Sequence, residues 1–299
     1  MIPSSLRFLS RPFRFLSMAS VLLALGAVAA CGASPESSQD PTQEPSQAPS
    51  PDADASEDPT PDPVPERAVE VFESGSGAAT VVFESGLGVG WTPWKPVALE
   101  VAAKARVFAY SRPGYGKSDP SPEPRDAAHI VEDLRVLLAT RGYAPPYVLV
   151  GHSFGGAYME LFAKAHPEEV TGVVLVDTRH RDFTVACEEG GFEGCVVSPE
   201  VLATLPQVQQ DEVEAFALTS DEIRAVGGFG AYPVRVLTAT SHGFTTELET
   251  LWESMHTSLA EEAEDGEQTV YPGANHQLQL QRAHEVAEVI LSVVSASEE

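Results

Sequence analysis

A serine flanked by glycines at the spacing G-x-S-x-G lies in the segment 151–155, and this is the strongest chemical signal in the sequence. The pattern is typical of a sharp turn between a strand and a helix that exposes a nucleophilic serine. An apolar run at 147–150 predicts the strand before the turn, and the pattern at 154–165 predicts the helix after it. Ser153 is therefore the candidate nucleophile.

The three cysteines, Cys31, Cys187 and Cys195, could belong to a metal site or to disulfides. We expect no metal site, because no second pair of Cys or His residues has the spacing of metal ligands. Cys31 ends an N-terminal segment that, as described below, predicts export and lipidation of this cysteine. Cys187 and Cys195 then remain as an even pair, which in an exported chain favours a disulfide. The sequence therefore predicts a bond between these two residues.

The elements that must position these residues alternate between strands and helices from residue 67 onward. Apolar and β-rich runs predict strands at 69–73, 80–84, 106–110, 147–150, 170–176, 234–238 and 269–271. Helical periodicity predicts helices at 126–141, 154–165 and 282–296, and a further helix around a stripe at 248–259. Such alternation predicts an α/β fold, a mostly parallel sheet covered by helices on both faces.

The segment 179–232 interrupts this alternation and contains the cysteine pair and two short helical patterns. It follows a predicted strand that ends at Asp177, so it should lie over the carboxyl ends of the strands, where such sheets bind ligands. We therefore interpret it as a cap or lid inserted into a domain that spans 67–299.

The N-terminus predicts export. Three arginines precede an apolar run at 18–30 that suits a signal peptide and is too short for a comfortable membrane span. The run ends at Cys31 in a sequence that resembles the lipobox of bacterial lipoproteins, so we expect residues 1–31 to be a signal peptide with Cys31 lipidated. An ordinary signal peptide and a retained membrane anchor are the alternatives. Residues 32–66 are rich in Pro, Ser and acidic residues and predict a disordered tether.

The charge balance restricts the partners. The chain has 18 basic and 44 acidic residues and a formal net charge of −26. A surface this acidic repels phosphate backbones, so we expect no nucleic-acid partner. The predicted partners are a small-molecule substrate and, through the lipid on Cys31, an extracytoplasmic membrane surface.

Four segments together resemble the α/β-hydrolase family over about residues 69–296. They are the loop 83–88, the segment 110–118, the serine turn 151–155 and the segment 273–276 before the last predicted helix. The segment 110–118 departs from the family pattern in having Ser111 where Asp is usual. The resemblance implies a serine hydrolase that needs no cofactor.

The resemblance also implies which groups carry the chemistry. His276 stands where the family has its base, which takes the proton of Ser153 and returns one to the leaving group. The backbone N–H groups of Leu87 and Phe154 stand where the family has its oxyanion hole. Arg112 is expected to brace loops rather than to bind substrate.

The acid that should orient His276 is harder to assign. Many relatives carry it after the strand that here is 234–238, but no carboxylate follows that strand before Glu247. Some relatives, including certain haloalkane dehalogenases and lipases, carry it one strand earlier, where this chain has Asp177. We therefore predict Asp177 as the acid, with Asp182 as the alternative.

The expected activity is the hydrolysis of carboxylic esters through an acyl-enzyme intermediate. The same groups would also serve an amide, lactone or carbon–carbon bond hydrolase. A surface lipoprotein that only binds is the alternative of a different class, and the presence of nucleophile, base and oxyanion loop argues against it. Dehalogenase and epoxide-hydrolase chemistry is not expected, because in this fold it uses an aspartate nucleophile.

Overall fold

The computed structural model describes residues 67–297. The predicted signal peptide, Cys31 and the predicted tether lie outside the described residues. Within the described part, no helix is long and apolar enough to cross a membrane.

The centre of the fold is a seven-stranded sheet in the order β1-β3-β2-β4-β5-β6-β7. Only β1 pairs antiparallel, with β3, and all other neighbours are parallel. The predicted mostly parallel sheet is confirmed. The strands are β1 (Val71–Ser74), β2 (Thr80–Glu84), β3 (Arg106–Tyr110), β4 (Tyr147–His152), β5 (Val170–Val176), β6 (Pro233–Ala239) and β7 (Asp265–Tyr271).

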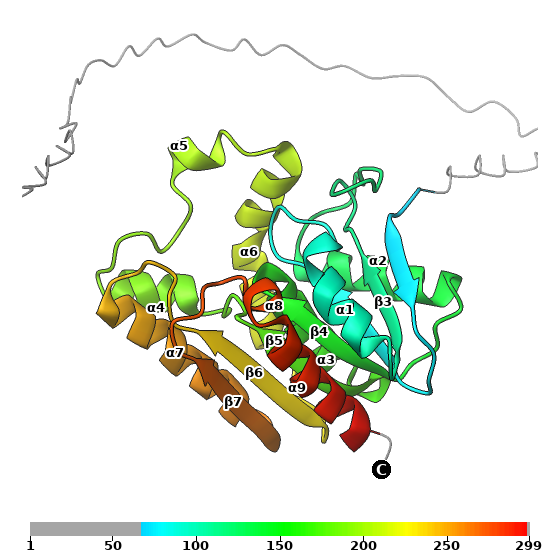
Figure 1. Cartoon of the computed structure of the whole chain (residues 1–299). Helices are drawn as coiled ribbons and strands as arrows, with labels where there is room; N and C mark the ends of the chain where they lie inside the picture. Colours follow the sequence, from blue (N-terminus) through cyan, green and yellow to red (C-terminus); the bar gives the residue numbers. More distant parts are fainter. Residues whose placement is uncertain (1–66, 298–299) are drawn as a thin grey trace, which may run out of the picture. The chain divides into compact units, whose positions relative to one another are not determined.

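Helices cover both faces of this sheet, because its central strands are apolar on both sides (Figure 1). On one face, Val82 and Leu149 pack against helices α2 and α3. On the other face, Val81 and Val148 pack against helices α1 and α9. The helices are α1 (Lys95–Val101), α2 (Ala127–Thr140), α3 (Phe154–Ala165), α4 (Phe183–Glu189), α5 (Pro199–Leu202), α6 (Gln207–Ala225), α7 (Thr246–Glu261), α8 (Leu278–Gln281) and α9 (Ala283–Ala296).

The segment 179–232, which we call the insertion, carries α4, α5 and α6 between β5 and β6. The N-terminal part of α6 lies against the loops that follow β2 and β3. A Cβ added to Gly88 would stand 3.1 Å from the Gln209 side chain, and one added to Gly114 would stand 3.1 Å from Val208. Since both loops leave the carboxyl ends of their strands, α6 covers this edge of the sheet.

The predicted disulfide between Cys187 and Cys195 is confirmed. The bond joins the end of α4 to the following loop, with 5.6 Å between the two Cα atoms. Both cysteines are buried in a small cluster with Phe183 and with Leu248 and Trp252 of α7. The disulfide therefore fixes the first half of the insertion against α7.

Candidate active site

The serine turn has the strained backbone that its sequence predicts. Ser153 has φ 55° and ψ −124°, an uncommon conformation for a residue with a side chain, and α3 begins directly after it. A Cβ on Gly151 would lie 2.5 Å from the carbonyl oxygen of Gly155, so no larger residue fits there. The turn therefore holds Ser153 at the edge of the sheet, at the start of a helix.

The loop after β2 packs directly against this turn. A Cβ on Gly155 would lie 2.4 Å from the Ser85 carbonyl oxygen, and one on Gly86 would lie 3.1 Å from the Ser153 Cβ. Leu87 directly follows Gly86, and Phe154 directly follows Ser153. The two amides predicted to form an oxyanion hole therefore lie next to the contact between Gly86 and Ser153. Neither amide donates a hydrogen bond to another described residue.

Arg112 braces this loop from beneath, as the sequence predicts. Its guanidinium donates to the Ser85 carbonyl over 2.5 Å and to the Gly86 carbonyl over 3.0 Å. Its charge is balanced by Glu84 at 2.5 Å and by Glu212 of α6 at 2.9 Å. All of these carboxylate and guanidinium groups are buried, so the insertion and the loop share one internal ion-pair network.

Asp177 and His276 are brought together from 99 positions apart in the sequence. Asp177 follows β5 at φ 45° and is fully buried, and its Oδ2 lies 2.6 Å from Nδ1 of His276. The alternative acid, Asp182, instead pairs with Arg224 at 2.6 Å and with Arg181 at 3.5 Å. The geometry therefore favours Asp177 as the partner of the histidine.

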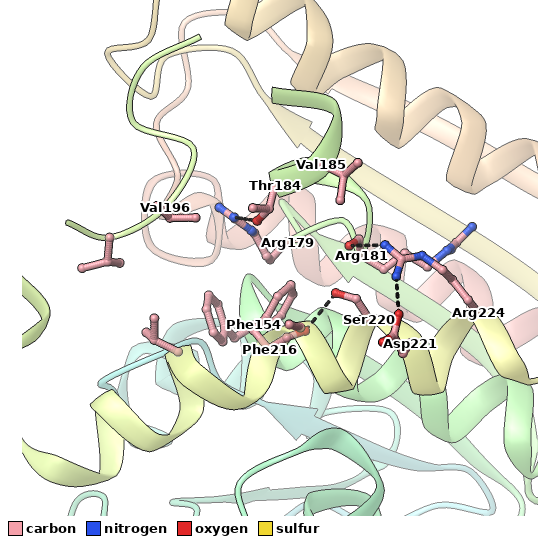
Figure 2. Close-up of a pocket in the computed structure, with 13 residues that line it drawn as sticks. Phe154, Arg179, Arg181, Thr184, Val185, Val196, Phe216, Ser220, Asp221 and Arg224 are labelled. Atoms are coloured by element: carbon pink, nitrogen blue, oxygen red, sulfur yellow. Dashed lines mark hydrogen bonds and ion pairs between the residues drawn. The ribbon is translucent and has the colours of Figure 1, made fainter. Parts of the chain in front are cut away.

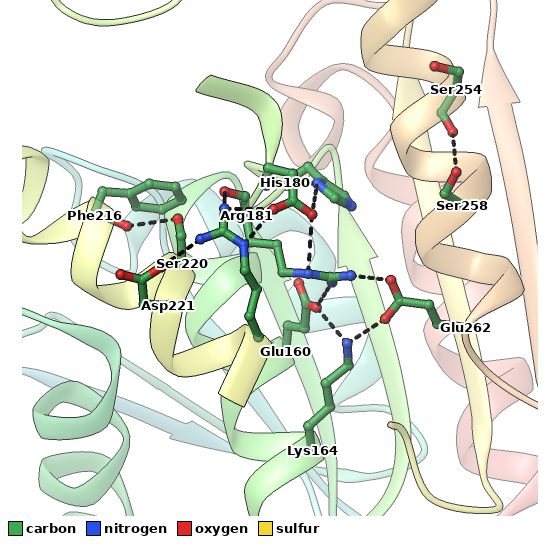
Figure 3. Close-up of polar contacts among 12 residues, drawn as sticks. Glu160, Lys164, His180, Arg181, Phe216, Ser220, Asp221, Ser254, Ser258 and Glu262 are labelled. Atoms are coloured by element: carbon green, nitrogen blue, oxygen red, sulfur yellow. Dashed lines mark hydrogen bonds and ion pairs between the residues drawn. The ribbon is translucent and has the colours of Figure 1, made fainter. Parts of the chain in front are cut away.

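Asp182 belongs to a separate polar cluster through its pairs with Arg181 and Arg224. Figure 3 shows how Arg181 of this cluster ties the insertion to Glu160 and Glu262 in the rest of the domain. In this cluster Arg181 pairs with Glu160 of α3 and with Glu262 after α7. Lys164 bridges the same two glutamates, at 2.8 Å and 2.6 Å. These contacts explain the polar run around Asp182 as structural.

Asp177 accepts hydrogen bonds from more donors than the sequence analysis anticipated. Besides His276, it accepts from the Trp252 ring N–H over 3.0 Å and from the backbone N–H of Ala239 over 2.9 Å. His242 Nε2 lies 2.7 Å from the same Oδ2 that meets His276. Burial opposes its charge, but the hydrogen bonds from His242 and His276 hold the pKa of Asp177 well below its usual range.

His242 is the site residue that the sequence analysis missed. Its Nε2 faces Asp177, and its Nδ1 lies 2.6 Å from Oε2 of Glu249 on α7. The backbone N–H of His242 also donates to Glu249, over 2.7 Å. A carboxylate at each ring nitrogen favours the doubly protonated ring, and although burial opposes this charge, both carboxylates raise the pKa of His242. The sequence signal is a histidine just after the strand 234–238, where many relatives carry their acid.

We expect His242→Gln to destabilise the protein most at low pH. Because the folded pKa is raised, the contribution of His242 is fully present below the unfolded value of about 6.5 and is lost as the pH rises through the folded value. Urea denaturation between about pH 5 and 9 should show the gap in unfolding free energy between wild type and variant narrowing with pH. Glu249→Gln should weaken the same pH dependence, and a gap that widens with pH would contradict a protonated His242.

Two other buried histidines are held neutral and support the site through the backbone. His152 Nε2 donates to the carbonyl of His276 over 2.7 Å, and burial followed by the nearby His276 lowers the pKa of His152 to about 3. His256 donates from Nε2 to the Thr178 carbonyl over 2.9 Å, and burial lowers its pKa to about 4. His152 thus does more than pack beside the serine turn: it positions the backbone of the candidate base.

A cavity of about 390 Å³ gathers the candidate groups. Ser153 and His276 line it together with His242, Trp252 and Phe244. A second cavity, of about 340 Å³, lies between α6 and the first half of the insertion (Figure 2). Phe154 and Arg179 line both cavities, so the two adjoin beside the serine turn.

A tetrahedral zinc ion does not fit between the three candidate ligands in their observed geometry. Ligand atoms of Asp177, His242 and His276 lie close together, but the two nitrogen–oxygen contacts measure only 2.6 Å and 2.7 Å. Ligands 2.0–2.1 Å from a tetrahedral zinc ion would stand about 3.3 Å apart. These contacts have the length of charge-assisted hydrogen bonds.

Comparison with known proteins agrees with this architecture. A family model described as alpha/beta hydrolase fold matches residues 79–193. The protein YqjL of Bacillus subtilis is 36% identical over 118 residues, which are 38% of this chain and 47% of that protein. The chain thus spans less than half the length of the curated relatives that it matches.

Solved structures extend the likeness to most of the chain. An esterase from Thermogutta terrifontis aligns with a TM-score of 0.56 at 18% identity, over 78% of this chain and 95% of that one. The enol-lactonase of Burkholderia xenovorans LB400 aligns with a TM-score of 0.55 at 18% identity, over 78% of this chain and 98% of that one. The chain therefore has the α/β-hydrolase fold.

Proposed function

From the α/β-hydrolase fold and the groups gathered at its carboxyl edge, we propose that this chain is a serine hydrolase of carboxylic esters. The observation that carries the proposal is the pairing of His276 with the buried, ionised Asp177 in the cavity that Ser153 lines. A serine at this turn also argues for acyl transfer rather than for chemistry that needs an aspartate nucleophile.

The proposed reaction begins with attack of the Ser153 hydroxyl on the ester carbonyl. Nε2 of His276 takes the hydroxyl proton, while Asp177 accepts from Nδ1–H and stabilises the imidazolium that forms. The amides of Leu87 and Phe154 hold the negative charge that develops on the carbonyl oxygen. Arg112, by fixing the carbonyls of the loop after β2, keeps the first of these amides in place.

The tetrahedral intermediate then loses its alcohol, which leaves with the proton held by His276. Water enters the cavity, His276 removes a proton from it, and the resulting hydroxide attacks the acyl carbon. The bond to the Ser153 oxygen then breaks, His276 returns the proton to that oxygen, and the acid is released. His242 takes no proton in this scheme. It shares the Asp177 oxygen with His276 and keeps the carboxylate ionised and oriented.

An active-site phosphonate probe tests the proposal directly. Wild-type protein should gain one probe molecule per chain, and peptide mass mapping should locate it on Ser153. The same protein should hydrolyse p-nitrophenyl esters, and a series of acyl lengths would separate an esterase of short chains from a lipase. A chain that binds the probe elsewhere or not at all, and turns over no ester, would be a binding protein instead.

We also propose that the enzyme works outside the cytoplasm, held to the membrane by a lipid on Cys31. Full-length wild type expressed in a bacterium should partition with membranes and release a lipidated N-terminal peptide. Cys31→Ser should move the protein to the soluble or unprocessed fraction. Cys195→Ser is the matched control, since it removes a cysteine without touching the anchor. Soluble wild type with an unmodified Cys31 would overturn the anchor.

A further inference from the structure

Arg179 lies where the two cavities adjoin, close to the serine turn. Its backbone N–H donates to the carbonyl of Ser153 over 2.9 Å, and its side chain lines both cavities. Figure 2 shows this side chain in the second cavity. The guanidinium packs over the ring of Phe183, with 4.6 Å from Cζ to the ring centroid, and 5.7 Å from that of Phe216. A ligand in either cavity can therefore lie against this cation.

Arg179 differs from the other arginines of the second cavity in having no anionic partner. Arg181 is paired with Glu160 and Glu262, and Arg224 is paired with two aspartates. Among residues 67–297, no carboxylate lies within 4.0 Å of the Arg179 guanidinium. Its hydrogen bonds go to neutral oxygens, Thr184 Oγ1 at 2.7 Å and the Cys195 carbonyl at 2.9 Å.

The Arg179 side chain also keeps unused hydrogen-bonding capacity. Both of those bonds leave from Nη2, and the buried Nε finds no acceptor among the described residues. A partly buried cation without a counter-ion is costly, and desolvation alone lowers the pKa of Arg179 to about 10. A guanidinium offers a planar set of donors that matches a carboxylate. A ligand with a carboxylate would therefore supply the anionic partner that no described residue provides.

We propose that Arg179 binds a carboxylate of the substrate, so that the preferred esters are anionic. This inference rests on the proposed ester hydrolysis and names the substrate class for it. The carboxylate pairs with Arg179 where the cavities adjoin, while the ester carbonyl lies at Ser153. Apolar parts of the substrate lie along the valines of the second cavity, Val196, Val197 and Val213.

The net charge of the chain excludes long-range attraction as the cause of a preference for anionic esters. At −26, the protein as a whole repels anions, so its long-range field disfavours an anionic ester. A preference for the anionic member of a matched pair of esters must then come from a local cation. Raising the salt concentration should weaken the repulsion from the surface more than the contact with a partly buried arginine.

Two pairs of esters test the proposal on either side of the scissile bond. The first pair is 4-nitrophenyl hydrogen adipate and 4-nitrophenyl hexanoate, which differ in an acyl-side carboxylate. The second pair is 3-(4-acetoxyphenyl)propanoate and 4-propylphenyl acetate, which differ in an alcohol-side carboxylate. In at least one pair, wild type should favour the anionic ester in kcat/KM by about 10- to 100-fold, the range of a charge-assisted hydrogen bond.

Arg179→Met should bring that ratio to one or below, mainly by slowing the anionic ester, because the negative field of the protein then acts alone. Arg179→Lys, which keeps the charge but loses the planar donors, should retain part of the preference. Arg224→Gln is the matched control, since it removes a cation of the same cavity that already has carboxylate partners. It should change the ratio less than about threefold, and thermal unfolding of each variant verifies that it is folded.

A purely structural role for Arg179 makes the opposite prediction. It would lower kcat/KM for both members of a pair by the same factor, and that result would overturn the proposal. A wild type that hydrolyses the neutral and the anionic member of both pairs equally well would also overturn the proposal for Arg179. That result would leave the proposed ester hydrolysis unaffected. If no ester is turned over, calorimetric titration of the Ser153→Ala variant with monomethyl adipate still tests carboxylate binding by Arg179. The proposal requires that this variant binds the monoester and that the double variant with Arg179→Met does not.

Discussion

Replacing Ser153 by alanine should lower kcat for ester hydrolysis by about 10⁶-fold, the loss seen when a serine nucleophile is removed from a comparable triad. The substitution deletes only Oγ and leaves the strained turn, which the neighbouring glycines and the start of α3 maintain. Substrate binding should persist, because the cavity walls are untouched. The measurement is the steady-state rate on p-nitrophenyl butyrate, together with loss of the phosphonate label.

Ser241→Ala is the matched control for the nucleophile. Ser241 lines the same cavity but lies in the exposed loop after β6. Its loss should change kcat by less than about tenfold, because the proposed reaction assigns no step to this hydroxyl, and as a change at an exposed position it should alter stability by no more than about 0.5 kcal/mol. If the Ser241 variant were the inactive one, or if Ser153→Ala kept its turnover, the nucleophile would be misassigned.

Asp177→Asn should lower kcat by up to about 10⁴-fold while leaving the fold intact. An asparagine side chain can present an N–H to His276 Nδ1 and so hold the ring in the wrong tautomer. Asparagine also tolerates the positive φ of this position, so the backbone after β5 need not move. Steady-state kinetics on p-nitrophenyl butyrate should show the loss mainly in kcat, and circular dichroism should report an unchanged fold.

Asp182→Asn, which removes a carboxylate five residues further along and inside the insertion, separates the role of Asp177 from a general effect of losing a negative charge in this region. Asp182 is partly exposed and pairs with Arg224 and Arg181 rather than with a histidine. Its replacement should cost less than about 1 kcal/mol of stability and little turnover. An inactive Asp182 variant beside a nearly active Asp177→Asn would transfer the role of the acid to the insertion.

The sequence alone predicted the serine turn at the carboxyl edge of the sheet. The glycines around Ser153 and the strand–helix context that they need are contiguous in the chain, so their spacing alone predicts the turn. The same holds for the alternating apolar runs, which predict the parallel sheet, and for the cysteine pair at 187 and 195. Short-range steric rules dictate these features, and the structure confirms the sheet and the disulfide.

Element lengths were less well determined where polar residues continue a strand. Apolar residues predict a strand at 269–271, yet β7 begins at Asp265. β7 is an edge strand whose first residues are exposed, so pairing with β6 sustains it where its own composition does not. The first residues of β7 are therefore in a strand only because they pair with β6, which comes from an earlier part of the chain.

The contacts that give individual polar side chains their roles were decided only by the tertiary structure. Asp177, His242 and Glu249 form one chain of hydrogen bonds because β5 and β6 end, and α7 begins, at the same place in space. Within residues 67–297, Arg179 has no carboxylate within 4.0 Å, whereas Arg181 and Arg224 of the same cavity are each paired with two or more. Sequence spacing determines which residues can turn or pair locally, whereas the choice among many acidic and basic partners depends on distances that only the packed fold defines.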